Sequence, residues 1–209
     1  CGMKYLITTL LLFISFFLIK DGNIVDNVVA SITPDKYLDK IKAILNQTKD
    51  LLTRYFVGVV IQISIIMLVV TLGLMFLGVK NALLIGFIAA IFNIIPYVGP
   101  LMGALVGISL AATGQLEAHP DLNLNSFIFT AIIPFAVAQA LDNFALQPLI
   151  FSKSVKAHPL EIFLVILAAG SLAGVVGMIV AVPAYSFIRI VAKEFFNGYK
   201  AVQGLTKDL

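Results

Sequence analysis

The sequence predicts an all-α membrane protein built from transmembrane helices and two broken helical hairpins, and three observations support this fold class. Of the 209 residues, 60% are hydrophobic and only 12% are charged, with a mean hydropathy of +1.04. A soluble chain carries roughly a quarter charged residues. The apolar segments are long and do not alternate with polar residues, which favours helices. Several of them are interrupted by clusters of proline and glycine.

The N-terminal part predicts a membrane span followed by an amphipathic helix and a second span. Tyr5–Ile19 is the first expected span, and Val57–Leu77 is the second. Between them, segment 20–56 contains Thr33, Pro34 and Asp35, which together favour a helix start. Apolar residues then recur at helical spacing, with charges on the other faces. We expect a cytoplasmic helix lying on the membrane or against a second copy in a homo-oligomer.

The third apolar segment, 82–113, is interrupted by NIIPYVGP. Its first arm, 82–95, would span about 21 Å at ~1.5 Å per residue, against a bilayer core of ~30 Å. Pro96 and Pro100 bracket a turn in which Gly99 can adopt unusual dihedral angles. We expect a re-entrant hairpin that enters from outside and whose arms are too short to cross.

Segment 160–190 predicts a second hairpin, entering from inside, with its tip at Gly170, Gly174 and Gly177. Paired interrupted helices that enter from opposite sides are typical of a transport site near the bilayer midplane. The two tips would then gate the site by alternating access. Kinked spanning helices with structural prolines are the alternative interpretation of both segments.

The distribution of basic residues predicts the topology. Twelve of the 14 Lys and Arg residues face the cytoplasm if segment 20–54 lies inside, whereas Lys4 and Lys80 face out. This is the bias expected for a multi-pass protein of the bacterial inner membrane whose C-terminus is cytoplasmic. The twelve residues are Lys20, Lys36, Lys40, Lys42, Lys49, Arg54, Lys153, Lys156, Arg189, Lys193, Lys200 and Lys207.

Segment 127–151 is expected to form a helix with one polar face. Gln139, Asp142, Asn143 and Gln147 occur at offsets 0, 3, 4 and 8, which places them on one side of an α-helix. A carboxylate at membrane depth is costly and is usually paired or functional. Asp142 could bind Na⁺, carry a proton or hydrogen-bond a polar solute. A polar clamp between helices is the alternative.

Four further polar residues were assigned smaller roles. His158 and Glu161 begin the last hairpin one turn apart and could form a proton relay, although a capping or interfacial role is equally open. Gln62 and Ser64 in the second span are expected to make hydrogen bonds between helices rather than to bind solute.

The remaining composition argues against several classes of function. A net charge of +3 does not suggest nucleic acid as a partner. The one cysteine and two histidines leave no metal cluster and no HExxH motif, and no phosphate-binding loop occurs. Asp142 is the one aspartate placed within an apolar segment, so an aspartyl pair is not available in one chain. We therefore expect neither an enzyme nor a cofactor, and any transport would be secondary or passive.

Four segments, in this order, carry a resemblance to a known family: FFLIKDG (16–22), TPDKY (33–37), GVKNALLIGFIAAIFNIIPYVGP (78–100) and DNFALQPLIFSKSVKAHPLEIFLVILAAGSLAGVVGMIVAVP (142–183). They resemble the bacterial autoinducer-2 exporter family of membrane transporters. Family members are longer, with an additional N-terminal membrane region, so we expect this sequence to correspond to their C-terminal part.

The resemblance implies an inner-membrane transporter. Some members are associated with export of autoinducer-2 and others with Na⁺(Li⁺)/H⁺ antiport, so the resemblance does not choose a substrate. It also implies roles for the residues that match the family motifs: Asn93, Pro96, Gly99, Pro100, Asp142, Gln147, Pro148, His158, Pro159, Gly174, Gly177 and Pro183.

Two hypotheses follow. The first is a secondary transporter in which the two hairpins and the Asp142 helix form a site for a small polar solute or for Na⁺/Li⁺. Asp142, Asn143, Gln139 and Asn93 would supply hydrogen bonds to the solute, with Gln147 beside them. The second hypothesis is a non-transporting membrane scaffold or assembly protein that works through segment 20–56.

Overall fold

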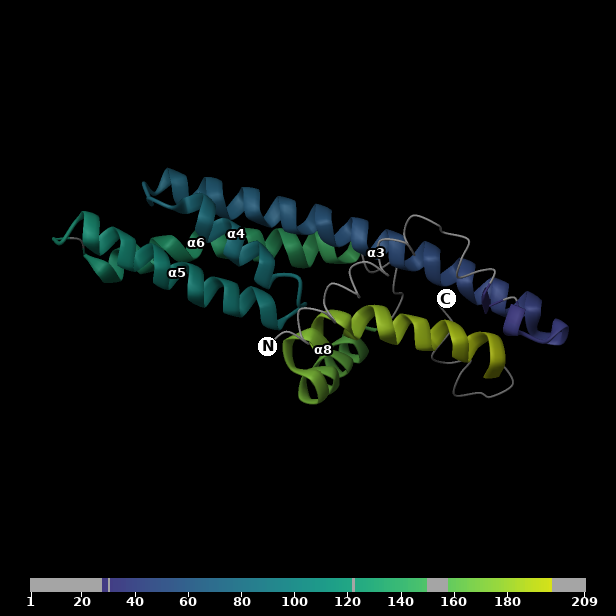
Figure 1. Ribbon diagram of the computed structural model, residues 1–209. Helices are drawn as coiled ribbons and strands as arrows, with labels where there is room; N and C mark the ends of the chain where they lie inside the picture. The colour runs from purple at the N-terminus through teal and green to yellow at the C-terminus, as the bar shows by residue number, and fades with distance from the viewer. Residues whose placement is uncertain (1–27, 30, 122, 150–157, 197–209) are drawn as a thin grey trace, which may run out of the picture.

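The computed structural model describes residues 28–29, 31–121, 123–149 and 158–196. Its elements, in chain order, are α3 (Asp35–Phe76), α4 (Ala82–Phe92), α5 (Val98–Ala118), α6 (Leu124–Leu141), the short π-helix η1 (Asp142–Leu146) and α8 (Pro159–Phe196) (Figure 1). Four helices are long and apolar enough to cross a membrane, and α4 is shorter. The all-α membrane class is therefore confirmed for the described residues. The expected span Tyr5–Ile19 lies outside them.

Helix α3 joins two elements that the sequence predicted separately. The amphipathic segment and the second span form one helix of 42 residues. The helix continues without a break through residue 56, where the sequence divides the amphipathic segment from the second span. At ~1.5 Å per residue α3 is about 63 Å long, roughly twice the thickness of a bilayer core.

The N-terminal half of α3 packs against α8 of the same chain. Ile44 and Leu51 form a buried cluster with Ile190. The Lys40 ammonium donates a hydrogen bond to the Glu194 carbonyl at 3.2 Å. At least part of the apolar face that was expected to meet lipid or a second copy is therefore covered by the protein itself.

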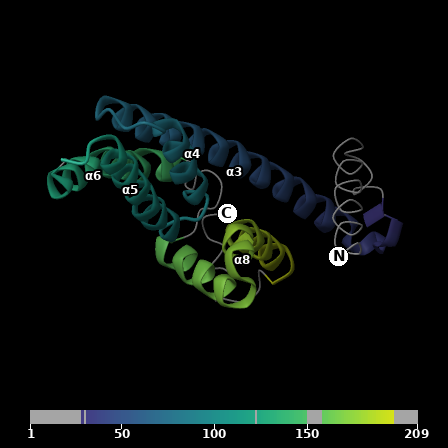
Figure 2. The same cartoon turned by 60° about the vertical axis from the view of Figure 1, so that its left-hand side comes forward.

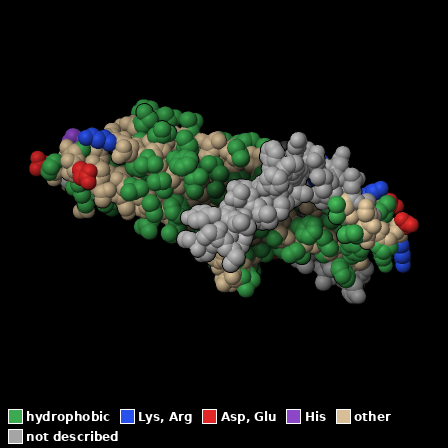
Figure 3. All heavy atoms as spheres, in the orientation of Figure 1, with side chains coloured by type: hydrophobic (Ala, Val, Ile, Leu, Met, Phe, Trp, Pro, Cys, Tyr) green, Lys and Arg blue, Asp and Glu red, His purple; other side chains and the backbone are tan. Residues whose placement is uncertain are grey.

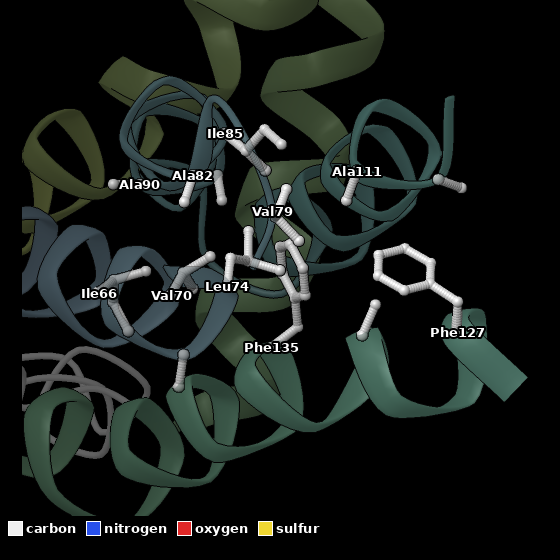
Figure 4. Packing of buried hydrophobic residues seen from close by; sticks show 14 of the residues in the cluster. Ile66, Val70, Leu74, Val79, Ala82, Ile85, Ala90, Ala111, Phe127 and Phe135 are labelled. Atoms are coloured by element: carbon white, nitrogen blue, oxygen red, sulfur yellow. The ribbon is translucent and has the colours of Figure 1, made fainter. Parts of the chain in front are cut away.

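Helices α4 and α5 form hairpin 1 (residues 82–118), which packs with α6 around the C-terminal half of α3 (Figures 1 and 2). Figure 4 shows Phe135 of α6 reaching toward Leu74, Val79 and Ile85, which come from α3, the following loop and α4. The arms of hairpin 1 approach closely at Gly99, where an added Cβ would lie 1.9 Å from the Phe92 carbonyl oxygen.

Helix α8 is itself folded into hairpin 2 (residues 159–196). The chain leaves helical geometry at Ala173 and at Gly174, which has φ 59° and ψ −143°. Its two arms pack together: Ile162 and Ile166 of the first share a buried cluster with Ala181 and Val182 of the second (Figure 2). The break falls where the glycines predicted it.

The expected arm lengths need correction. Helix α5 has 21 residues and reaches about 31 Å, so the second arm of hairpin 1 is long enough to cross a bilayer core. The second arm of hairpin 2 continues from residue 175 to 196 and is also long. Each hairpin therefore pairs one short arm with one long arm.

On the face shown in Figure 3, charged side chains gather at the two ends, and the coloured surface between them is mainly hydrophobic. The contact of Lys40 with Glu194 places the start of α3 and the end of α8 at one end. The Gln115 amide donates to the Leu77 carbonyl at 3.4 Å, which places Lys80 at the other. Among the described residues, Lys40 and Lys80 therefore lie at opposite ends, and which end faces the cytoplasm stays a prediction.

Candidate functional site

A cavity of about 670 Å³ lies between α3, α4, α5 and the α6–η1 helix. We call it the central cavity. Its walls are mostly apolar, and no charged side chain lines it among the described residues. Its polar lining consists of Asn93, Tyr97, Gln139, Asn143 and Gln147. Four of the five residues predicted to bind solute or ion therefore line one cavity.

Three of these side chains form a hydrogen-bonded row along α6 and η1. The Gln139 amide donates to Asn143 Oδ1 at 2.8 Å, and the Gln147 amide donates to the same oxygen at 3.4 Å. Spacings of four residues put side chains on one helical face. The row gives the cavity amide groups, which can both donate and accept hydrogen bonds.

Asp142, the fifth predicted residue, does not line the cavity. Its side chain is fully buried, and its two oxygens accept hydrogen bonds from Gln62 Nε2 at 2.7 Å and Gln147 Nε2 at 2.8 Å. The expected interhelical hydrogen bond of Gln62 is confirmed, whereas Ser64 donates to the Val60 carbonyl of its own helix. The geometry matches the polar clamp that the sequence left open.

The π-helix explains why Asp142 and Gln147 meet. In an α-helix, five residues turn through about 500°, which leaves side chains i and i+5 far apart in direction. In η1 the Gln147 N–H donates to the Asp142 carbonyl, so the chain closes an i→i+5 turn that brings the two residues nearly into line. Hydrophobic periodicity does not reveal such a turn, and the predicted single polar face is therefore divided in the structure.

Asn93 follows the last residue of α4, lines the cavity and carries an unsatisfied donor. Its side chain is 5% exposed, and its Nδ2 has no hydrogen-bond partner among the described residues. A buried amide without a partner costs about 1–3 kcal/mol. Native proteins rarely retain such a group unless another role compensates.

Tyr97 closes the tip of hairpin 1 in a strained conformation. It has φ 66° and ψ −52°, and the Val98 N–H donates to the Pro96 carbonyl at 2.8 Å, which defines a γ-turn. Positive φ is unfavourable for a residue with a Cβ. The Tyr97 ring lines the cavity and meets Phe163 of hairpin 2 edge to face, with ring centroids 5.8 Å apart. The sequence alone does not predict a role for Tyr97.

The residues predicted at the hairpin tips lie near them. Pro96 is buried in the turn, whereas Pro100 lies in the first turn of α5, where a missing N–H is tolerated, and lines the cavity. In hairpin 2, Gly170 faces Met178 and Gly177 faces the Ala169 carbonyl, so both allow the arms to approach. The tip of hairpin 1 contacts the first arm of hairpin 2 through Tyr97 and Phe163.

His158 and Glu161 are engaged separately at the start of α8. His158 Nδ1 accepts a hydrogen bond from the Leu160 N–H at 3.3 Å, in the manner of a cap. The Tyr185 hydroxyl donates to Glu161 Oε2 at 3.0 Å across hairpin 2. The Glu161 N–H donates to the His158 carbonyl at 2.9 Å, but no hydrogen bond joins their side chains in the described structure, and the proton relay stays a prediction.

The fold and the cavity together define a multi-pass helical membrane protein with a largely apolar cavity between its helices that carries a few polar groups. The chain belongs to the AI-2E family transporters, because the sequence model of that family matches residues 3–197. The family expected from the sequence motifs is thereby confirmed.

The similar curated proteins are named as transport proteins. The chain is 36% identical over 180 residues to "Putative transport protein YueF" of Bacillus subtilis (strain 168), covering 85% of this chain and 46% of that protein. It is 30% identical over 193 residues to "Putative transport protein YrrI" of the same organism, covering 92% and 52%. With "Putative permease PerM" of Escherichia coli (strain K12) it shares 26% identity over 183 residues, covering 88% and 50%. The chain spans about half the length of the curated relatives it matches, and no solved structure matches it significantly.

Proposed function

We propose that this chain forms the solute-binding part of a secondary membrane transporter and that the central cavity binds a small, uncharged polar solute. The observation that carries the proposal is the unsatisfied Asn93 donor in the cavity wall. Once the Asn93 side chain turns toward the cavity, a solute oxygen would accept its hydrogen bond and remove the cost of leaving the amide unpaired. The family membership and the names of the relatives support transport rather than catalysis.

The lining of the cavity favours a neutral solute over an ion. Asn93, Gln139, Asn143 and Gln147 present amides, and Tyr97 presents an aromatic ring and a hydroxyl. A few polar groups on largely apolar walls are typical of sites for small organic molecules. A solute of the autoinducer-2 type, rich in hydroxyl groups, fits this chemistry.

The transport cycle that we propose uses the two hairpins as re-entrant elements of an inner-membrane protein whose C-terminus is cytoplasmic. The short first arm of each hairpin supports this arrangement, and in the proposed topology the two hairpins enter from opposite sides. Hairpin 1, which carries Asn93 and Tyr97 into the cavity wall, would open the site to one side, and movement against hairpin 2 would open it to the other.

Cation/proton antiport is the second candidate. One observation favours it: Asp142 is a fully buried carboxylate whose hydrogen-bond partners in the described chain are neutral amides. A Na⁺ or Li⁺ ion would have to displace at least one of these amides to reach it. The scaffold hypothesis is weakened because the N-terminal half of α3 packs on α8 instead of presenting its whole apolar face.

The test uses the full-length protein in vesicles, with labelled autoinducer-2, ribose and glycerol as uncharged probes. Collapse of a pH gradient by Na⁺ or Li⁺ is measured in the same vesicles. We expect movement of at least one uncharged probe and no cation-driven collapse. Collapse of the pH gradient without movement of an uncharged probe would contradict the proposal and support cation/proton antiport. The absence of both signals would contradict transport of these solutes.

The variant Asn93→Leu tests whether the unpaired amide of Asn93 binds the solute. Removing an unpaired buried amide should raise stability by about 1–3 kcal/mol while transport of the probe falls at least about tenfold. Thr71→Val is the matched control, because Thr71 Oγ1 is also buried and unpaired but does not line the cavity. It should raise stability and leave transport unchanged. Equal transport in both variants would show that Asn93 does not take part in solute binding.

A further inference from the structure

Gln62 and Asp142 join α3 to η1 behind the wall of the central cavity. They are 5% and 0% exposed, respectively, and neither lines the cavity. Asp142 also holds Gln147, whose side chain does line it. The hydrogen-bonded chain Gln62–Asp142–Gln147 therefore leads from a neighbouring helix to the candidate binding surface.

The carboxylate fixes the orientation of the Gln147 amide. A carboxylate can only accept hydrogen bonds, so both glutamines must turn their nitrogen atoms toward Asp142. The distances of 2.7 Å and 2.8 Å are those of charge-assisted hydrogen bonds, which are stronger than neutral ones. Because an amide is planar, holding the Gln147 nitrogen also sets the direction of its oxygen.

We infer that Gln62 and Asp142 are positioning residues that hold the Gln147 amide in one orientation in the cavity wall and do not touch the solute. This inference rests on the proposed function and refines it. It differs from the sequence prediction, in which Asp142 itself contacts the solute or ion. It also gives a role to Gln62, which lies one turn before the cavity-lining Ile66.

Replacement of Asp142 by asparagine separates the two roles. An asparagine at 142 can accept from Gln147 through its oxygen and donate to Gln62 through its nitrogen, once the Gln62 amide has flipped. A positioning role therefore tolerates Asp142→Asn, whereas a cation or proton site needs the carboxylate. Asp142→Leu and Gln62→Leu abolish the contact in either case.

The experiment measures KM and maximal rate for autoinducer-2 in vesicles carrying the full-length protein. Gln62→Leu should raise KM about tenfold, the loss expected for one hydrogen bond to a charged group, with a smaller effect on the rate. Asp142→Asn should stay within about threefold of wild type, and so should the exchange variant Gln62→Glu with Asp142→Asn, which keeps both hydrogen bonds. Ser64→Ala is the matched control on α3, because Ser64 bonds only its own helix in the described structure.

Two results would overturn the inference while the proposed function stands. One is a wild-type KM in Gln62→Leu, and the other is complete loss of transport in a folded Asp142→Asn protein. If the wild-type protein moves none of the probes, the proposed function has failed. Thermal unfolding then tests whether the hydrogen bond between Gln62 and Asp142 exists. The loss of melting temperature in Gln62→Leu with Asp142→Leu should then be smaller than the sum of the single losses, because both remove the same contact. Additive losses of melting temperature would show that Gln62 and Asp142 do not share this contact.

Discussion

The two hairpins close their turns in different ways. Hairpin 1 uses Tyr97, a residue with a side chain, in a strained γ-turn that packs against Phe163. Hairpin 2 uses Gly174, for which an added Cβ would meet nothing within 4 Å, and its neighbour Leu172 is 87% exposed. The tip of hairpin 1 is thus packed in protein and beside the cavity, whereas the tip of hairpin 2 is open.

This difference indicates where side-chain chemistry is needed. A strained backbone conformation costs about 1–3 kcal/mol and persists only where its surroundings enforce it. At Tyr97 the ring packing and the position in the cavity wall provide a reason to retain that cost. At Gly174 only the turn itself is required, and glycine forms it with little strain.

The largest effect is expected from closing the space between the arms of hairpin 1. Gly99→Ala places a methyl group 1.9 Å from the Phe92 carbonyl oxygen, and backbone cannot move aside as a flexible side chain can. We expect a loss of about 3 kcal/mol or a failure to fold. Gly114→Ala in α5 is the control, since its Cβ would meet nothing within 4 Å. Equal melting temperatures for both variants would contradict the close approach.

A smaller loss is expected at the tip of hairpin 2. Gly174→Ala has space for its methyl group but must adopt φ 59° with ψ −143°, a region used almost only by glycine. We expect a loss of about 1–3 kcal/mol, measured by thermal unfolding of the detergent-solubilised protein. Transport by the cavity should be less affected than by Gly99→Ala. A fully neutral Gly174→Ala would mean that the turn can open without cost.

The smallest effects are expected from a matched pair of tyrosines. Tyr185→Phe removes the hydrogen bond to Glu161 and should cost about 1 kcal/mol of stability without changing probe affinity. Tyr97→Phe keeps the ring contact with Phe163 and should leave stability unchanged while weakening the binding of a hydroxylated probe about tenfold or less. A loss of probe affinity in Tyr185→Phe, together with a loss of stability alone in Tyr97→Phe, would mean that hairpin 2 and not hairpin 1 contacts the probe.

Local sequence signals predicted most of the fold. The proline and glycine clusters placed both turns, because few other residues can form them. Composition placed the chain in a membrane. The change from charged to apolar residues near residue 56 did not reveal that α3 is one helix, because such a change alters the surroundings of a helix without ending it.

The candidate site was predicted less completely. Offsets along an α-helix correctly put Gln139, Asn143 and Gln147 on one face, but the i→i+5 turn at Asp142 depends on packing that periodicity does not express. The strained Tyr97 carries no sequence signature, since a tyrosine in a turn is not expected to take positive φ. The partnership of Gln62 with Asp142 joins residues 80 positions apart and requires the three-dimensional structure.

Helix α3 contacts both hairpins without a break, with Tyr55 in the cluster of hairpin 2 and Val70 in that of hairpin 1. The two contacts lie about 22 Å apart along one helix. One residue inserted between them would turn one contact about 100° relative to the other and shift it by about 1.5 Å. We therefore expect the length of segment 55–70 to be constant among related proteins, and insertions to accumulate in the connections between helices.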